Sequence, residues 1–362
     1  MGGAKTGARN LPETCMKIAD RPIDAQHPPY LIAEMSANHN GSLDRALAIV
    51  DAAADAGADA IKLQTYTADT MTLDCDDHGF VIQDRDSPWH GRHLHELYNE
   101  AHLPWEWHRP IFERAAERSI HCLSSPFDAS AVDFLEGLGA PAYKIASFEL
   151  VDLPLIRVVA ATGKPMIMST GMATPAEIDE AVRTAKAAGN DQIVLLKCTS
   201  TYPATPANTN IATIPHLAAM TGCAAGLSDH TMGCGVAVAA TALGAVLIEK
   251  HFTLSRADGG VDSAFSMEPA ELAQLREETV RAWQAIGTVR YGDVAAEDSS
   301  RTFRRSLYIT RDLAAGSVID ESAIRAIRPG FGLAPRHLDA LIGRRVSRDV
   351  ARGTPASWDL IG

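Results

Sequence analysis

The stretch from residue 223 to residue 252 reads CAAGLSDHTMGCGVAVAATALGAVLIEKHF and contains two apolar runs, each followed by a histidine. Cys223 to Leu227 leads to His230, and Ala245 to Ile248 leads to His251. Short apolar runs of this kind are typical of buried strands. At the ends of neighbouring parallel strands, two neutral imidazoles would face one cavity and could hold a divalent metal ion. Histidines satisfied within the core are the alternative interpretation.

Six further apolar runs precede this stretch, and helical patterns alternate with them. The eight predicted strands are Tyr30 to Glu34, Ala58 to Leu63, Ile120 to Leu123, Ala142 to Ile145, Pro165 to Met168, Gln192 to Leu196, Cys223 to Leu227 and Ala245 to Ile248. Amphipathic helical patterns include Leu43 to Ala56, Trp107 to Arg118, Ala129 to Leu138, Pro175 to Ala188 and Ala270 to Ala285. Eight alternating strand and helix units predict a TIM barrel.

Polar residues gather where these strands end. Seven of them lie at or just past a strand's C-terminal end: Glu34, Lys62, Lys144, Ser169, Lys197, Ser228 and His251. In a TIM barrel this is the catalytic rim, although loops that follow strands are also polar because they are solvated. The segment from Thr67 to Pro104 is long for such a loop and predicts a lid or a specificity loop, with a disordered surface insertion as the alternative.

Four of the chain's eight lysines follow apolar strands, namely Lys62, Lys144, Lys197 and Lys250. Lysines buried at strand ends need anionic partners, which a small substrate with a phosphate and a carboxylate would supply. Hydroxyl-rich stretches such as Ser124-Ser125 and Thr199-Ser200 could donate further hydrogen bonds. A Schiff-base lysine at Lys144 or Lys197 is an alternative, and structural pairing with a glutamate is the alternative for Lys250, which strand alternation would point outward.

Composition limits the other classes of function. The net charge of -12 argues against nucleic acid as a partner, and no apolar stretch is long enough to span a membrane. The six cysteines form no CxxC pair and no secretory signal precedes the first strand, which predicts reduced thiols and a cytoplasmic location. No glycine-rich dinucleotide fingerprint or Walker-type loop is present.

A change of pattern near residue 287 predicts a second domain. We expect an N-terminal extension over 1–28, the barrel over 29–286, a linker over 287–302 and a small domain over 303–362. Residues 301–362 hold eleven Arg against six Asp or Glu, a net charge of +5, so the other 300 residues carry -17 to give the total of -12. The basic domain is expected to dock on an acidic barrel, its own or that of a partner.

Several motifs together resemble the sialic acid synthase family. They are EMSANHNG at 34–41, KLQT at 62–65, YKIAS at 143–147, STGM at 169–172, KCT at 197–199 with YP at 202–203, SDHT at 228–231 and EKHFT at 249–253. Within the family, PWEW at 104–107, SSPFD at 124–128 and ASFE at 146–149 are most similar to the branch that makes pseudaminic acid. The sialic acid and legionaminic acid branches are the alternatives.

The resemblance implies a TIM barrel followed by an antifreeze-like (SAF, β-clip) domain that reaches over the partner's active site in a domain-swapped homodimer. It implies metal-dependent condensation of phosphoenolpyruvate with an open-chain amino sugar, 2,4-diacetamido-2,4,6-trideoxy-L-altrose, to give the nine-carbon acid and phosphate. The metal would be manganese, with magnesium or cobalt as alternatives. A metal-dependent aldolase and a non-catalytic sugar-binding relative are the competing hypotheses.

The resemblance also implies roles for individual residues. His230 and His251 would hold the metal, and Glu34 would orient the aldehyde or move protons. The phosphate and carboxylate of phosphoenolpyruvate would be bound by Lys62, Lys144, Ser147, Ser169 and Ser200. Gln64 and Tyr202 would line the site, and Asp262 would contact sugar hydroxyls. Arg328, from the partner's second domain, would reach the sugar's acetamido group. The family usually has Gly-Gly-Pro-Asp where this chain has Gly259-Gly260-Val261-Asp262, so a less rigid turn is expected at Asp262.

Overall fold

The computed structural model describes residues 16–85, 87, 89–292 and 295–362, so the first 15 residues of the expected extension lie outside the described residues. The chain forms two compact units with a boundary between Gly287 and Thr288. We describe each unit by itself.

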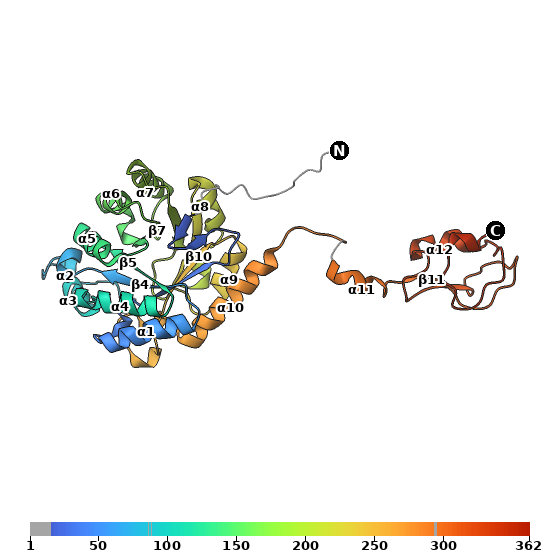
Figure 1. Ribbon diagram of the computed structural model, residues 1–362, viewed down its shortest axis with the longest axis horizontal. Helices are drawn as coiled ribbons and strands as arrows, with labels where there is room; N and C mark the ends of the chain where they lie inside the picture. The colour runs from blue at the N-terminus through green and yellow to red at the C-terminus, as the bar shows by residue number, and fades with distance from the viewer. Residues whose placement is uncertain (1–15, 86, 88, 293–294) are drawn as a thin grey trace. The chain divides into compact units, whose positions relative to one another are not determined.

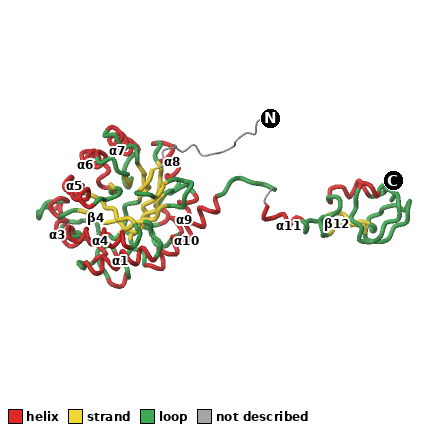
Figure 2. Tube along the Cα trace, viewed as in Figure 1, coloured by secondary structure: helices red, strands yellow, loops and turns green. Residues whose placement is uncertain are grey.

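The first unit is a closed barrel of eight parallel strands. Figures 1 and 2 show strands at the centre of this unit. The strand order around it is β10, β3, β4, β5, β6, β7, β8 and β9. Their bounds are β3 Tyr30–Glu34, β4 Ala60–Thr65, β5 His121–Pro126, β6 Tyr143–Ile145, β7 Met166–Ser169, β8 Ile193–Cys198, β9 Ala224–Asp229 and β10 Leu247–His251. Every predicted strand is present, and the predicted TIM barrel is confirmed.

Helices surround the strands (Figure 2). They are α1 Leu43–Asp55, α2 Ala68–Met71, α3 Leu94–Ala101, α4 Trp105–Glu117, α5 Ala129–Leu138, α6 Leu153–Ala161, α7 Pro175–Ala187, α8 Thr213–Thr221, α9 Gly235–Ala242 and α10 Pro269–Ile286. Local sequence sets their ends: α7 starts with a capping box in which Thr174 and Glu177 bond each other's backbone N–H, and Pro175 fills the first helical position. The apolar helix faces and the outward strand residues form one large core.

A short hairpin closes the N-terminal end of the barrel. It consists of β1 Met16–Ile18 and β2 Arg21–Ile23, paired antiparallel. Met16, Ile18 and Ile23 are buried in the same cluster as the apolar residues that fill this half of the lumen, among them Ile32, Ala60, Leu123, Ile167, Val194 and Leu247. Residues 16–23 were expected to belong to an extension before the barrel. They instead complete the barrel core, because the hairpin covers apolar side chains that would otherwise face water.

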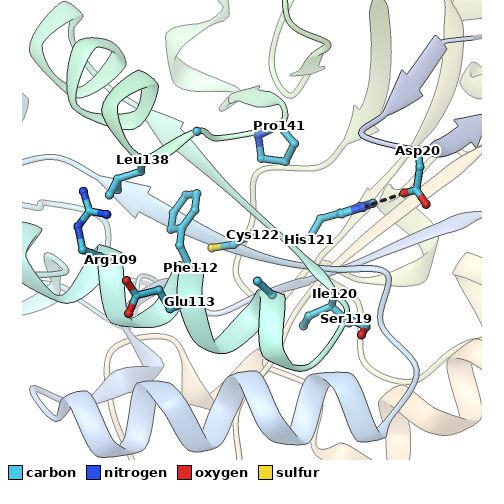
Figure 3. A pocket seen from close by; sticks show the side chains of 12 residues that line it. Asp20, Arg109, Phe112, Glu113, Ser119, Ile120, His121, Cys122, Leu138 and Pro141 are labelled. Atoms are coloured by element: carbon cyan, nitrogen blue, oxygen red, sulfur yellow. Dashed lines mark ion pairs between the residues drawn. The ribbon is translucent and has the colours of Figure 1, made fainter.

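A cavity of about 570 Å³ lies beside this hairpin, between α4, the start of β5 and the end of α5 (Figure 3). His121 and Asp20 face each other at one side of it, with His121 Nε2 3.5 Å from Asp20 Oδ1. None of the predicted site residues lines this cavity. It belongs to the N-terminal end of the barrel, whereas barrel enzymes react at the C-terminal end.

The second unit contains β11 Ser306–Ile309 paired antiparallel with β12 Ile324–Ile327, together with α11 Asp298–Arg301 and α12 Leu338–Leu341. Its own apolar core includes Leu307, Ile324, Leu341, Val346 and Leu360. Among the described residues, no helix is long and apolar enough to cross a membrane. Cys75, Cys122, Cys198, Cys223 and Cys234 are free thiols, as predicted, and Cys15 lies outside the described residues.

Candidate active site

Two carboxylates and two lysines form a buried network in the C-terminal half of the barrel lumen. Lys62 Nζ lies 2.6 Å from Glu34 Oε2 and 3.5 Å from Glu249 Oε1. Lys144 Nζ lies 3.3 Å from the same Glu249 oxygen, which also accepts a hydrogen bond of 3.0 Å from Ser228 Oγ. All four charged side chains are at most 5% exposed. Alternation places them here, because every second residue of a barrel strand points into the lumen.

Burial and mutual contact set the protonation of this network. Burial, reinforced by the negative charge of Glu249, raises the pKa of Glu34 to about 7. Burial alone would also raise the pKa of Glu249, but Lys144 and Lys62 hold it down at about 2. Burial lowers the pKa of Lys144, and its neighbours do not fully compensate. The network therefore combines a carboxyl group that exchanges protons near neutral pH with cations that can accept an anionic ligand.

His230 and His251 lie together at the ends of β9 and β10, with ring centroids 5.3 Å apart. His230 Nδ1 lies 2.9 Å from the carbonyl oxygen of Thr199; a carbonyl only accepts, so Nδ1 carries a proton and Nε2 is the ring nitrogen that could bind a metal. His251 Nδ1 is buried without a hydrogen-bond partner. Burial and the adjacent His230 lower the pKa of His251 well below its usual value, which keeps this ring neutral.

These two rings fit the demand of a divalent metal ion for neutral imidazole ligands. Across residues 16–85, 87, 89–292 and 295–362, no group of three or more His, Cys, Asp or Glu is placed to hold a metal. A metal ion held by these two histidines would keep coordination positions open for substrate and water.

Serine hydroxyls converge on Gly171 after β7. The Gly171 N–H donates to Ser147 Oγ at 3.1 Å, and a Cβ at Gly171 would collide with Ser200 Oγ and lie 2.7 Å from Ser147 Oγ. Ser169 Oγ is buried without a hydrogen-bond partner. Converging donors, one of them unsatisfied, are what a phosphate or carboxylate group requires.

A second chain of hydrogen bonds starts at Glu34 and leads to the turn after β10. Gln64 Nε2 donates to Glu34 Oε1 at 3.0 Å and lies 3.1 Å from Ser36 Oγ, whose hydroxyl donates to Asp262 Oδ2. The Ala37 N–H lies 3.4 Å from the same Asp262 oxygen, and Asp262 is buried. Despite Val261 in place of proline, Asp262 is thus held in a defined position beside the network.

An aromatic cluster covers the histidine pair. The Tyr202 ring lies 4.5 Å from the His230 ring and 5.3 Å from that of Phe265, and Phe265 lies 5.0 Å from His251, all between ring centroids. Within the first unit, the structure brings the predicted site residues together at one end of the barrel. Arg328 belongs to the second unit, where it lines a cavity of about 610 Å³ with Arg305 and Arg325.

The expectation that four lysines bind the anion is wrong for two of them. Leu196 fills the lumen, so the next residue, Lys197, points away from it; its Nζ lies 2.6 Å from the Cys198 carbonyl oxygen. Lys250 is buried outside the lumen, where it pairs with Asp229 Oδ2 at 2.9 Å and donates to the Gly233 carbonyl. The structural interpretation of Lys250 is correct, although its partner is Asp229.

Sequence reasoning missed two glutamates. Glu249 is the glutamate adjacent to Lys250 in sequence, yet it points into the lumen, where Oε1 lies 3.3 Å from Lys144 Nζ. Strand alternation predicts this, because Glu249 lies two residues from the inward-facing His251. Glu149 lies in the short helix Phe148–Val151 that follows Ser147, and one of its oxygens is buried without a hydrogen-bond partner. Burial raises the pKa of Glu149 to about 7. No periodic pattern marks Glu149; its only sequence signal is its place at the end of the ASFE motif at 146–149.

Comparison with known proteins agrees with this geometry. The model of the NeuB family matches residues 49–291, and the model of the SAF domain matches residues 304–362. The chain belongs to the NeuB family. The resemblance to sialic acid synthases and the expected SAF domain are therefore confirmed.

Relatives of this NeuB-family chain include the pseudaminic acid synthase of Campylobacter jejuni subsp. jejuni serotype O:2, with 42% identity over 90% of this chain and 94% of the relative. The pseudaminic acid synthase of Helicobacter pylori is 40% identical over 92% of this chain and 97% of the relative. Among solved structures, the N-acetylneuraminic acid synthetase of Leptospira borgpetersenii, in complex with citrate, has a TM-score of 0.70 and 30% identity, covering 79% of this chain and 94% of that protein. These similarities support the pseudaminic acid branch.

Proposed function

We propose that this chain is a pseudaminic acid synthase, which condenses phosphoenolpyruvate with 2,4-diacetamido-2,4,6-trideoxy-L-altrose and water to give pseudaminic acid and phosphate. The observation that supports this most strongly is the histidine pair beside a network of two buried lysines. That arrangement supplies an electrophilic end for an aldehyde and a cationic end for a phosphorylated carboxylate. The match to pseudaminic acid synthases over about nine tenths of the chain supports the choice of acceptor.

Phosphoenolpyruvate would lie over Lys62 and Lys144, with Ser147, Ser169 and Ser200 around its anionic groups. The unsatisfied Ser169 hydroxyl and the close approach of Ser147 and Ser200 to Gly171 support this placement. Both lysines now share the charge of Glu249. A substrate dianion would give them further partners and so offset part of their cost of burial.

The acceptor sugar would bind at the opposite end of the network. Gln64, Tyr202 and Asp262 surround this region, and Glu34 connects it to Lys62. His230 and His251 would hold the divalent ion, which we propose to be manganese and which supplies Lewis-acid polarisation of the aldehyde carbonyl. The neighbouring Cys198 raises the pKa of His230 despite its burial, so metal binding would displace a proton from this ring.

The chemistry then needs few protein groups. The enol carbon of phosphoenolpyruvate attacks the aldehyde carbon, and the aldehyde oxygen takes up a proton to become a hydroxyl. Glu34 is placed to supply that proton, since its pKa of about 7 leaves it partly protonated at neutral pH. Water adds to the carbon that carries the phosphate and releases a proton, which restores Glu34. Phosphate then leaves by C–O cleavage and takes up the proton of the new hydroxyl, which becomes the ketone.

A substrate panel tests this proposal. We expect phosphate release from phosphoenolpyruvate, a divalent metal and the altrose-configured acceptor, and much less with glucose- and mannose-configured acceptors. A preference for N-acetylmannosamine would reject the pseudaminic acid assignment and leave the family intact. Turnover with a pyruvate donor, and none with phosphoenolpyruvate, would favour the aldolase hypothesis instead.

We also propose a homodimer in which the second unit of one chain brings Arg328 to the sugar site of the other. The exposed arginines around Arg328 and the opposite net charges of the two parts of the sequence support this. Co-expression of His251→Ala and Arg328→Ala chains tests it, because mixed dimers would contain one intact site. Restored activity in the mixture, with both homodimers inactive, is expected; no restoration in verified mixed dimers would refute the exchange.

A cytoplasmic location remains a prediction and rests on the free thiols.

A further inference from the structure

Trp89 lies in the long segment between β4 and α4 that was predicted to be a lid or specificity loop. Val81 pairs with His93 in an antiparallel bridge. The Ile82 N–H donates to the Arg92 carbonyl at 3.0 Å, and the Ile82 carbonyl accepts a hydrogen bond of 2.8 Å from the Gly91 N–H. These bonds close the base of a turn. Trp89 lies within that turn and is half-buried.

Two contacts connect Trp89 to the candidate sugar site. Its indole Nε1 donates a hydrogen bond of 3.2 Å to the carbonyl oxygen of Val261. Its ring centroid lies 5.9 Å from that of Tyr202, with the rings inclined at 55°. Trp89 therefore joins three segments that are remote in sequence: the long segment, the loop after β8 and the turn after β10.

The contact with Val261 bears on the position of Asp262. Gly259 and Gly260 adopt φ angles of +72° and +120°, and Val261 does not restrict the backbone as proline would. The indole hydrogen bond fixes the carbonyl group directly before Asp262. On the other side, Ser36 and Ala37 hold the Asp262 carboxylate itself.

The contact with Tyr202 extends the aromatic cluster away from the histidine pair. Tyr202 contacts both the His230 ring and the Trp89 ring, at centroid distances of 4.5 and 5.9 Å. An acceptor whose aldehyde lies at the histidines would extend along this cluster. The proposed acceptor carries three methyl groups, two on its acetamido groups and one at C6, and aromatic faces are suited to bury such groups.

We propose that Trp89 is a positioning and specificity residue of the acceptor site, an inference that rests on the proposed function. Its indole N–H holds the turn that presents Asp262, and its ring extends the Tyr202 face against a methyl group of the acceptor. Trp89 has no part in binding phosphoenolpyruvate, because its contacts lie at the Asp262 and Tyr202 end of the site.

The test is steady-state kinetics of Trp89→Ala and Trp89→Phe, with each substrate varied in turn. We expect Trp89→Ala to raise the KM for the acceptor by about 10- to 100-fold, the range of losses typical for an apolar group in a binding pocket, and the KM for phosphoenolpyruvate to change by less than about twofold. Trp89→Phe keeps a ring and loses the N–H, so it separates the two roles. Leu73→Ala is the matched control, because it removes an exposed apolar side chain of the same segment.

Acceptor analogues identify the methyl group. If the C6 methyl meets Trp89, the preference for the 6-deoxy sugar over its 6-hydroxy analogue will diminish in Trp89→Ala; if an acetamido methyl does, the preference over the de-N-acetylated analogue will diminish. Unchanged acceptor KM and unchanged preferences in a folded Trp89→Ala variant would refute the inference. An equal rise in both KM values would also refute it. A wild-type chain that releases no phosphate with any acceptor would instead refute the proposed function, and with it this inference.

Discussion

Replacement of Glu249 by glutamine tests the charge network in the barrel lumen. Glutamine keeps the volume and can still accept the hydrogen bond from Ser228, but it removes the negative charge beside two buried lysines. Lys62 keeps Glu34 as a partner at 2.6 Å, whereas Lys144 is paired with Glu249 alone among the described residues. Loss of one member of a buried ion pair typically costs about 3 to 5 kcal/mol. Since Lys144 can release its proton, we expect a loss near the lower end, about 3 kcal/mol.

Urea unfolding of the barrel near pH 7.5 measures this loss directly. Glu278→Gln is a suitable control, because Glu278 pairs with Arg281 on the surface, where such pairs contribute about 0 to 1 kcal/mol. Phosphoenolpyruvate should raise the unfolding midpoint of Glu249→Gln more than that of the wild type. In the variant, the anionic groups of this ligand are no longer repelled by the carboxylate of Glu249. A Glu249→Gln variant as stable as the wild type would refute the conclusion that this carboxylate holds the lysines.

Three other predictions concern protonation, the metal and the core. Burial raises the pKa of Glu149 from about 4.5 to about 7, so ionisation of this carboxyl group opposes folding. Relative to Glu149→Gln, the wild type should therefore lose free energy of unfolding as the pH rises from 4.5 to 7, with no further loss above pH 7. A difference in unfolding free energy that does not change with pH would contradict this. His230→Ala and His251→Ala should each contain less bound metal by elemental analysis and release less phosphate, and treatment of the wild type with a chelator should have the same effect. A variant that keeps full turnover would exclude that histidine as a metal ligand. Ile18→Ala should destabilise the barrel by about 2 to 5 kcal/mol in urea unfolding, because Ile18 is fully buried in the lumen cluster, and a loss below about 0.5 kcal/mol would show that the hairpin does not support the core.

Much of the site was predictable because a parallel barrel converts sequence position into location. Each strand is a continuous apolar run, and its last inward residue reaches the same rim as the last inward residue of every other strand. Glu34, Lys62, Lys144, Ser169 and His251 could be placed together on this basis. Alternation within β10 also places Glu249 inward, two residues before His251.

The remaining features depend on contacts between residues far apart in sequence. Burial outside the lumen pairs Lys250 with Asp229, and nothing in EKHF distinguishes that pairing from one with the adjacent Glu249. The hairpin at residues 16–23 is too short to show a convincing period, and its role appears only when its three apolar side chains meet the barrel core. In the sequence, Trp89 is one aromatic residue in an irregular segment, and only the folded structure shows its contacts with Val261 and Tyr202.

The sequence by itself determined the architecture, the family and most of the polar residues that meet at the C-terminal end of the barrel, because strand periodicity and local motifs are short-range properties that a chain carries in linear form. Only the tertiary structure decided which lysines face the lumen, that the pKa of Glu34 is raised while that of Glu249 is lowered, and which distant side chains contact Tyr202 and the turn before Asp262. Those outcomes depend on burial and on distances of a few ångströms between separate elements, and linear order does not specify either.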